Sequence, residues 1–284
     1  MLNALTFDVE EYFHAESLAG VVRREDWALL PSRVAESTRR LLDLLEERQV
    51  KATFFILGWV AEREPRLVRE IQGRKHEVAC HGFGHRLIYG MNREAFRADV
   101  CRAKQAIEEA TGAAVAGFRA PTFSIVRETL WALDVLLETG FRYDSSIFPI
   151  RHDRYGIPDA PRFPYRIAAP GGGDLVEFPI TTLAVGRQHL PFSGGGYFRL
   201  TPYPMIRAAL RGVNRRERKP GIIYLHPWEL DPKQPRLPVR GFSRFRHYVN
   251  LAQTGRKLEH LLRDFRFAPA GHVLREQGFA EVWA

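Results

Sequence analysis

Short apolar runs alternate with amphipathic segments along most of this chain of 284 residues, and this alternation restricts its fold more than any other feature. The short runs have the length and composition of buried strands, whereas the longer segments repeat apolar residues every three or four positions, as one-sided helices do. The first strand carries the apolar residues Leu2, Ala4, Leu5 and Phe7. Further strands are predicted over residues 52–57, 76–79, 115–118, 141–144 and 221–225, and helices over 32–49, 65–73, 93–111, 127–139, 203–213 and 242–265.

Strands that alternate with helices of these lengths form successive βα units around a parallel sheet, so the predicted fold class is α/β. Because the units continue past five, we expect the sheet to close into a barrel. The pattern is interrupted over residues 151–199, which are rich in Pro and Gly around the strand-like run 175–180. We predict a single domain over 1–284, with its barrel core at 1–150 and 200–265 and a loop-rich insertion at 151–199 over the barrel mouth.

The composition is ordinary for a soluble globular protein, with 45% hydrophobic and 26% charged residues. Much of the net charge of +9 comes from three arginine-rich stretches at 211–219, 236–246 and 256–266. Such stretches bind nucleic acid, an anionic membrane surface or an anionic glycan, or simply form a solvated basic helix face. No zinc finger, helix-turn-helix or aromatic RNA-binding motif accompanies them, so we predict no nucleic-acid partner.

The cysteines and the N-terminal segment bear on the cellular compartment. Cys80 and Cys101 form no CxxC pair, which favours reduced thiols. The first thirteen residues lack the basic and apolar regions of a signal peptide, and no run of about 18 apolar residues could span a bilayer. The sequence therefore predicts a cytoplasmic protein and leaves open a peripheral contact with the inner membrane surface.

Acidic and histidine side chains follow two of the predicted strands. In the stretch TFDVEEYF, strand alternation puts Asp8 and Glu10 on one face and Glu11 on the other. His81 and His85 follow a later strand with a spacing that, in a helical turn, places both imidazoles on one face. A lone DxE or HxxxH is weak, since acids after strands are often caps. Together, two histidines and a carboxylate form a metal site with open positions, as catalytic sites have.

Three more polar clusters follow strands, at 117–121, 143–146 and 224–229, and they contain Arg119, Asp144 and His226. Each residue alone has an ordinary structural explanation: a surface ion pair, a helix cap and a core histidine. In a barrel of parallel strands, however, all carboxyl ends of the strands open onto one face, where active sites lie. The combination indicates the pocket of a metal-dependent hydrolase.

The motifs TFDVEEYF, HGFGH, FRAP, YDSS and YLHPWE, in this order between Leu2 and Glu229, resemble the five motifs of the polysaccharide deacetylase family, carbohydrate esterase family 4. The details DVEEYF, RYGIPDAPR, SGGGYFR and HPWE are most similar to deacetylases associated with exosortase and exopolysaccharide gene clusters. The resemblance implies a distorted (β/α)7-type barrel and a divalent metal ion, usually zinc. It also implies removal of N-acetyl groups from amino sugars of a polysaccharide or its precursor in exopolysaccharide biosynthesis, with release of acetate.

The resemblance also implies roles for individual residues. Asp8 matches the general base, Arg119 the arginine that orients it, His226 the general acid and Asp144 the acid that tunes the catalytic histidine; His81 and His85 match the metal-binding histidines. The family's adjacent aspartates are replaced by Asp-Val-Glu, and alternation favours Glu10 over Glu11 as the third ligand. Thr122 and Ile147 stand where the family commonly has tyrosine and tryptophan, and the backbone N–H at Thr122, an expected oxyanion donor, survives the first change.

The expected substrate is an N-acetylated amino sugar, either lipid-linked or a soluble intermediate. Five aromatic residues are candidates for a sugar platform, with core packing as the alternative for each: Tyr12, Phe13, Tyr197, Phe198 and Trp228. Two other functions stay open. One is hydrolysis of a small amide or cyclic ureide, as in allantoinase-like relatives, and the other is catalytically silent glycan binding.

Overall fold

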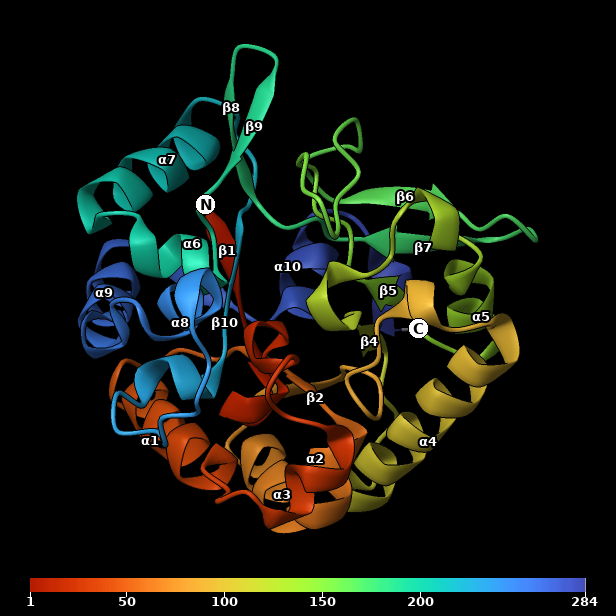
Figure 1. Ribbon diagram of the computed structural model, residues 1–284. Coiled ribbons are helices and arrows are strands. Elements are labelled where there is room, and N and C mark those ends of the chain that lie inside the picture. Colours follow the sequence, from red (N-terminus) through yellow and green to blue (C-terminus); the bar gives the residue numbers. More distant parts are fainter. Residues whose placement is uncertain (284) are drawn as a thin grey trace.

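The computed structural model describes residues 1–283, and in them seven parallel strands form the predicted α/β barrel (Figure 1). Each strand pairs in parallel with the next in the spatial order β10-β1-β2-β3-β4-β5-β7. Their bounds are β1 Leu2–Val9, β2 Thr53–Ile56, β3 Glu77–Cys80, β4 Gly117–Phe118, β5 Tyr143–Asp144, β7 Asp174–Glu177 and β10 Ile222–Leu225. A short strand, β11 (Arg266–Ala268), pairs with the beginning of β1.

Strand β1 shows how alternation positions the site. Leu5, Phe7 and Val9 belong to the core between the sheet and the outer helices. Ala4 belongs to a second core, which also contains Phe55 and fills the inside of the barrel. Because side chains alternate, Asp8 lies on the same face as Ala4 and points inward.

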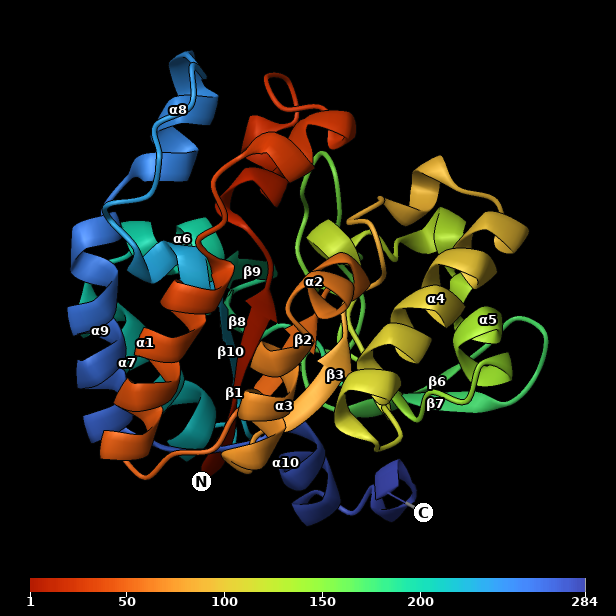
Figure 2. The same ribbon diagram turned by 90° about the horizontal axis from the view of Figure 1, so that it is seen from below.

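Helices surround the barrel and close its two ends differently. The outer layer contains α1 (Val34–Glu47), α2 (Gly58–Arg63), α3 (Pro65–Gly73), α4 (Arg93–Thr111), α5 (Ala132–Glu138), α7 (Tyr203–Arg215) and α9 (Leu251–Asp264). Seen from the side, α10 (Ala270–Glu276) lies at one end, whereas α8 (Gly241–Tyr248) rises at the opposite end (Figure 2). Helix α4 ends at Thr111 and is followed by Gly112, whose φ of 69° is a left-handed conformation that glycine adopts readily.

The stretch 151–199 differs from the predicted loop-rich insertion. Strand β7 pairs in parallel with β5 and is one of the barrel strands, while β6 (Tyr165–Ala168) pairs antiparallel with it. The following hairpin contains β8 (Thr182–Val185) and β9 (Gln188–Pro191). Between β7 and β10 the barrel is held by irregular contacts: the Ile222 N–H donates to Thr181 Oγ1 at 2.6 Å and the Tyr224 N–H to the Ser193 carbonyl at 3.0 Å. The sequence analysis did not assign β7 to the barrel because this short strand lies among many Pro and Gly residues.

The segment 242–265, predicted as one helix, contains two helices, α8 and α9. The break lies at Asn250, which has φ 54°. Asparagine tolerates this left-handed conformation better than most residues, and its side chain donates to the Arg199 carbonyl at 3.0 Å. Among residues 1–283, no helix combines the length and the hydropathy needed to cross a bilayer.

Candidate active site

The carboxyl ends of the barrel strands surround a cavity of about 460 Å³. Five of the predicted site residues line it: Asp8, Glu10, His81, His85 and His226. Arg119 lies beneath the cavity and is fully buried, and Asp144 is also fully buried away from the cavity wall. Most of the predicted site residues, although far apart in the sequence, therefore lie together at this cavity.

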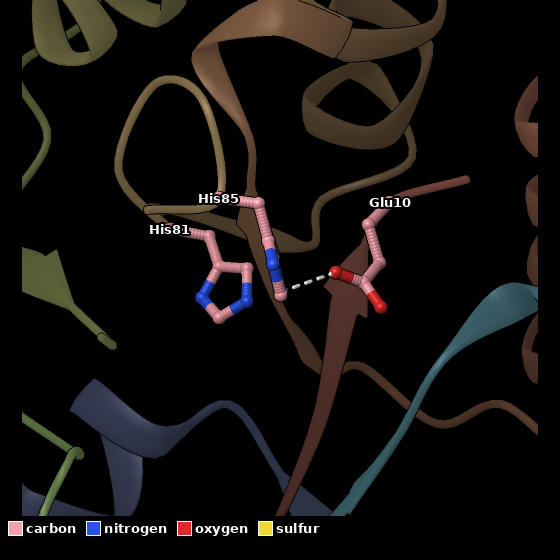
Figure 3. Close-up of side chains that lie close together, drawn as sticks. All are labelled: Glu10, His81 and His85. Atoms are coloured by element: carbon pink, nitrogen blue, oxygen red, sulfur yellow. Dashed lines mark ion pairs between the residues drawn. The ribbon is translucent and has the colours of Figure 1, made fainter. Parts of the chain in front are cut away.

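Glu10, His81 and His85 point toward one another, as Figure 3 shows. One potential ligand atom from each lies within 4.8 Å of the others, and His85 Nε2 is 2.9 Å from Glu10 Oε2. Glu11 points elsewhere and accepts a hydrogen bond from the Arg33 N–H at 2.9 Å, next to the start of α1. Strand alternation favoured Glu10 over Glu11 as the third ligand, and this geometry agrees with that choice.

The two histidines do not lie in a helical turn, so that part of the prediction is wrong. They belong to an irregular loop after β3, in which Gly82 has φ 71° and His85 has φ 49°. The left-handed turns bring the rings together, with centroids 5.6 Å apart.

The donor groups of this cluster fit a divalent metal ion. Burial lowers the pKa of His81 to about 4, so its ring is neutral, and Nδ1–H donates to the Arg119 carbonyl at 2.8 Å. This bond leaves the Nε2 lone pair for a ligand. Glu10 Oε1 accepts from Trp228 Nε1 at 3.1 Å. Within residues 1–283 the buried Oε2 has no other hydrogen-bond donor beside it than the ring of His85, with which it forms an ion pair. Two nitrogens and one carboxylate oxygen are typical of zinc and similar ions.

The charge state of Glu10 follows from its neighbours. Burial by itself raises the pKa of Glu10, but interactions with His85, and with His226 and His81 further away, outweigh it and lower the pKa below its usual value. The carboxylate is therefore held ionised inside the protein, as a metal ligand must be.

Asp8 is held in place by Arg119. The Asp8 Oδ1 atom accepts a hydrogen bond from Arg119 Nη1 at 2.7 Å, and the same nitrogen donates to Thr6 Oγ1 at 2.9 Å. Ser145 accepts from the other side of the guanidinium, through its carbonyl at 3.1 Å and its hydroxyl at 2.9 Å. Since Arg119 is fully buried, these bonds satisfy its charge and fix the Asp8 carboxylate at the cavity.

His226 faces both acids and is supported from behind. Its Nε2 lies 3.8 Å from Asp8 Oδ2 and 3.7 Å from Glu10 Oε1, while Nδ1 lies 2.7 Å from Glu229 Oε1. Burial lowers the pKa of His226, but the hydrogen bond to Glu229 and the surrounding acids raise it to about 9. Arg199 Nε donates to Glu229 Oε2 at 2.6 Å, which completes a buried series from Arg199 to His226.

The predicted pairing of Asp144 with the catalytic histidine is not found, because Glu229 occupies that position. Instead, Asp144 Oδ1 accepts from Ser146 Oγ at 2.5 Å, and Ser146 Oγ accepts from the Ala120 N–H at 2.8 Å. Asp144 is also paired in register with Glu177 on β7. Burial raises the pKa of Asp144 to about 6 and that of Glu177 well above its usual value. These two acids belong to the barrel wall.

Sequence reasoning missed Glu229 and Arg199, although both lie in motifs that it singled out, HPWE and SGGGYFR. The spacing of Glu229 three residues after His226 was the available signal, because such neighbours meet in a helical turn. Of the five candidate aromatic residues, Tyr197 and Trp228 line the cavity, whereas the other three are packed in the core: Tyr12, Phe13 and Phe198.

Thr122 lines the same cavity in an unusual conformation, with φ 54° and ψ 26°. A β-branched residue rarely adopts this region, so surrounding contacts must enforce it. The turn that contains it, Pro121–Phe123, directly follows Arg119 and Ala120, whose backbone is tied to His81 and Ser146. Strain of this kind is concentrated at functional sites.

Comparison with known proteins agrees with this geometry. Residues 4–143 match the family described as polysaccharide deacetylase, and residues 145–275 match a family described as a domain of unknown function (DUF3473). The peptidoglycan-N-acetylglucosamine deacetylase of Bacillus cereus is 31% identical over 100 residues, which are 35% of this chain and 36% of that protein. The chitooligosaccharide deacetylase of Sinorhizobium fredii is 36% identical over 100 residues, 35% of this chain and 44% of that protein.

The match therefore spans less than half of the length of these curated relatives. Among solved structures, Puue allantoinase superposes with a TM-score of 0.64 and 18% identity, covering 100% of this chain and 92% of that one. At this identity the similarity concerns the fold alone.

Proposed function

We propose that this protein is a metal-dependent hydrolase of N-acetylated amino sugars, because residues 4–143 belong to the polysaccharide deacetylase family. It would release acetate from a polysaccharide or its precursor. One observation carries the proposal: the buried Asp8 carboxylate, fixed by Arg119, shares a cavity with the Glu10, His81 and His85 cluster. The two curated relatives described above are named as deacetylases of amino-sugar polymers or oligomers, which supports this substrate class.

The chain's own residues divide the chemistry between them. A divalent ion held by Glu10, His81 and His85 would supply Lewis acidity toward the acetamide carbonyl. Asp8 would accept the proton of the attacking water, with Arg119 keeping its carboxylate in position. His226, which the raised pKa keeps protonated at neutral pH, would donate to the nitrogen of the departing amine. The backbone N–H of Thr122 would stabilise the developing oxyanion.

The finer assignments are part of the same proposal. Zinc is favoured by a set of two imidazoles and one carboxylate. A role in exopolysaccharide biosynthesis is supported by the resemblance of the motifs SGGGYFR and HPWE to deacetylases of exopolysaccharide gene clusters. A location in the cytoplasm stays a prediction from the N-terminal residues and the two cysteines.

A second candidate is hydrolysis of a small amide or cyclic ureide. The observation in its favour is the fold shared with Puue allantoinase along the whole chain. The cavity of about 460 Å³ would also accept a small substrate. The two candidates differ in their products, because only the deacetylase releases acetate.

The test is metal analysis of the purified protein together with acetate release from N-acetylglucosamine oligomers. We expect a divalent ion near one per chain, loss of about 100-fold or more of the activity after chelation, and recovery on adding Zn²⁺. Full activity in the metal-free protein would contradict metal dependence. Allantoin hydrolysis without acetate release would favour the second candidate.

A matched pair of variants sharpens the test. Glu10→Gln should lose the bound ion, because an amide is a weaker ligand than a carboxylate. Glu11→Gln changes the neighbouring buried glutamate, which contacts Ser32 and Arg33 instead of the histidines, and should retain the ion. Equal metal content in both variants would contradict the assigned ligand set.

A further inference from the structure

Helix α8 carries large apolar side chains that the fold leaves uncovered. Phe242 is 71% exposed and Phe245 is 50% exposed, and their rings lie 6.3 Å apart on one side of the helix. Figure 2 shows α8 standing above the barrel at the mouth end, near the red segment that follows β1. Phe242 also lines the active-site cavity, so the exposed surface continues into the mouth.

Arginines surround these rings without acidic partners. Between Pro232 and Leu258 the sequence has no Asp or Glu. Among the ion pairs of residues 1–283, none involves the exposed Arg236, Arg240 or Arg244. We define the α8 patch as these five exposed side chains: Arg236, Arg240, Phe242, Arg244 and Phe245.

The neighbouring segment 16–30 also exposes aliphatic side chains. This segment is attached to α8 through Ser17 Oγ, which lies 3.1 Å from His247 Nδ1. It exposes 82% of Leu29 and 42% of Val21. Aromatic rings with arginines could also bind single-stranded nucleic acid by stacking, but Leu and Val provide no ring on which a base could stack. Apolar side chains ringed by arginines fit the boundary between the headgroups and acyl chains of an anionic bilayer.

We propose that the α8 patch docks this protein on an anionic lipid bilayer, with the mouth of the active-site cavity toward the membrane. The phenylalanines insert at the headgroup boundary while the arginines pair with lipid phosphates. This orientation presents the cavity to an amino sugar attached to a membrane lipid, a consequence that rests on the proposed function. The docking itself does not depend on the reaction.

The experiment is co-sedimentation of the full chain with vesicles of phosphatidylcholine containing phosphatidylglycerol, and with pure phosphatidylcholine vesicles. We expect binding to the anionic vesicles that weakens as salt is added. Replacing two arginines, Arg240→Gln with Arg244→Gln, should weaken it about 10-fold or more, and Phe245→Ser should weaken it several-fold.

The control is the double variant Arg215→Gln with Arg216→Gln, which removes the same charge from the exposed end of α7, where no aromatic pair accompanies it. It should bind the vesicles as the unmodified protein does. Acetate release from soluble oligomers should be unchanged in the α8 arginine variant, which shows that the barrel is intact.

Three results would overturn the proposal: no binding to anionic vesicles at low salt, equal weakening by the α7 control, or tighter binding to single-stranded RNA than to vesicles. Vesicle binding without any acetate release would leave the docking in place and remove the proposed reaction instead.

Discussion

Two groups of buried acids in this barrel have opposite charge behaviour. Glu10, at the mouth, and Glu177, in the wall, are both almost inaccessible to solvent. Burial raises the pKa of each. Nevertheless the pKa of Glu10 ends below its usual value, whereas that of Glu177 ends well above it.

The neighbours explain the difference. Glu10 has the ring of His85 at 2.9 Å and that of His226 at 3.7 Å, so hydrogen bonding and the positive charge of His226 offset the loss of solvation. Glu177 lies beside Asp144, a like charge that favours a shared proton over two carboxylates. Depth of burial therefore does not distinguish the acids of the candidate active site from those of the barrel wall. The sign of the neighbouring charges distinguishes them.

The largest expected effect comes from Asp8→Asn. Asparagine can still accept a hydrogen bond from Arg119, but it cannot take a proton, so deacetylation should fall about 1000-fold. Metal content should stay near that of the unmodified protein, because Asp8 lies outside the cluster of Glu10, His81 and His85. The measurement is acetate release together with metal analysis. An active Asp8→Asn enzyme would remove Asp8 from the role of base, and metal loss would make it a ligand.

A smaller effect is expected from Glu229→Gln, which alters the support behind His226. Glutamine can keep a contact to Nδ1 but not the negative charge that stabilises the imidazolium, so kcat should fall about 10- to 100-fold. KM should change little, because Glu229 is fully buried and does not line the cavity. Asp144→Asn is the comparison variant, since the family resemblance gave that residue the role that Glu229 occupies. A larger loss of kcat in Asp144→Asn than in Glu229→Gln would contradict our assignment.

The sequence predicted those features that depend on local patterns. Alternation along β1 correctly placed Asp8 and Glu10 on the inward face, and the succession of βα units predicted the parallel barrel. It could not predict that Arg199 would meet Glu229, because the two residues are 30 positions apart and only the fold brings them together. It also misjudged the loop from His81 to His85, where Gly82 and His85 adopt left-handed conformations that a spacing rule ignores.

Glu177 shows the same limit at the other group of acids. Its strand lies among Pro and Gly residues that looked like an insertion, so nothing local indicated that β7 would pair with β5 and bring Glu177 beside Asp144. Pairing between distant strands is decided by the whole fold, so sequence motifs cannot predict a carboxyl pair that forms in this way.

The smallest effect, and the one that tests the wall pair directly, is expected from Glu177→Gln. The folded-state pKa of Asp144 is raised from 3.8 to about 6, and that of Glu177 is raised well above 4.5. Folding therefore takes up protons, and the stability contributed by the pair is fully present below about pH 4 and is lost as the pH rises through 6 and beyond. Glutamine resembles the protonated acid and cannot ionise, so the variant should lose less stability over this range.

The measurement is urea unfolding of both proteins at pH 5, 6.5 and 8. Between pH 5 and pH 8, we expect the free energy of unfolding of Glu177→Gln to rise by about 1 kcal/mol relative to that of the unmodified protein. Acetate release at neutral pH should stay within about twofold of the unmodified value, since the removed carboxyl does not line the cavity. Parallel stability curves would mean that Asp144 and Glu177 share no proton. The contrast with Glu10 would then come from something other than the charge of the neighbouring groups, because both glutamates are equally buried.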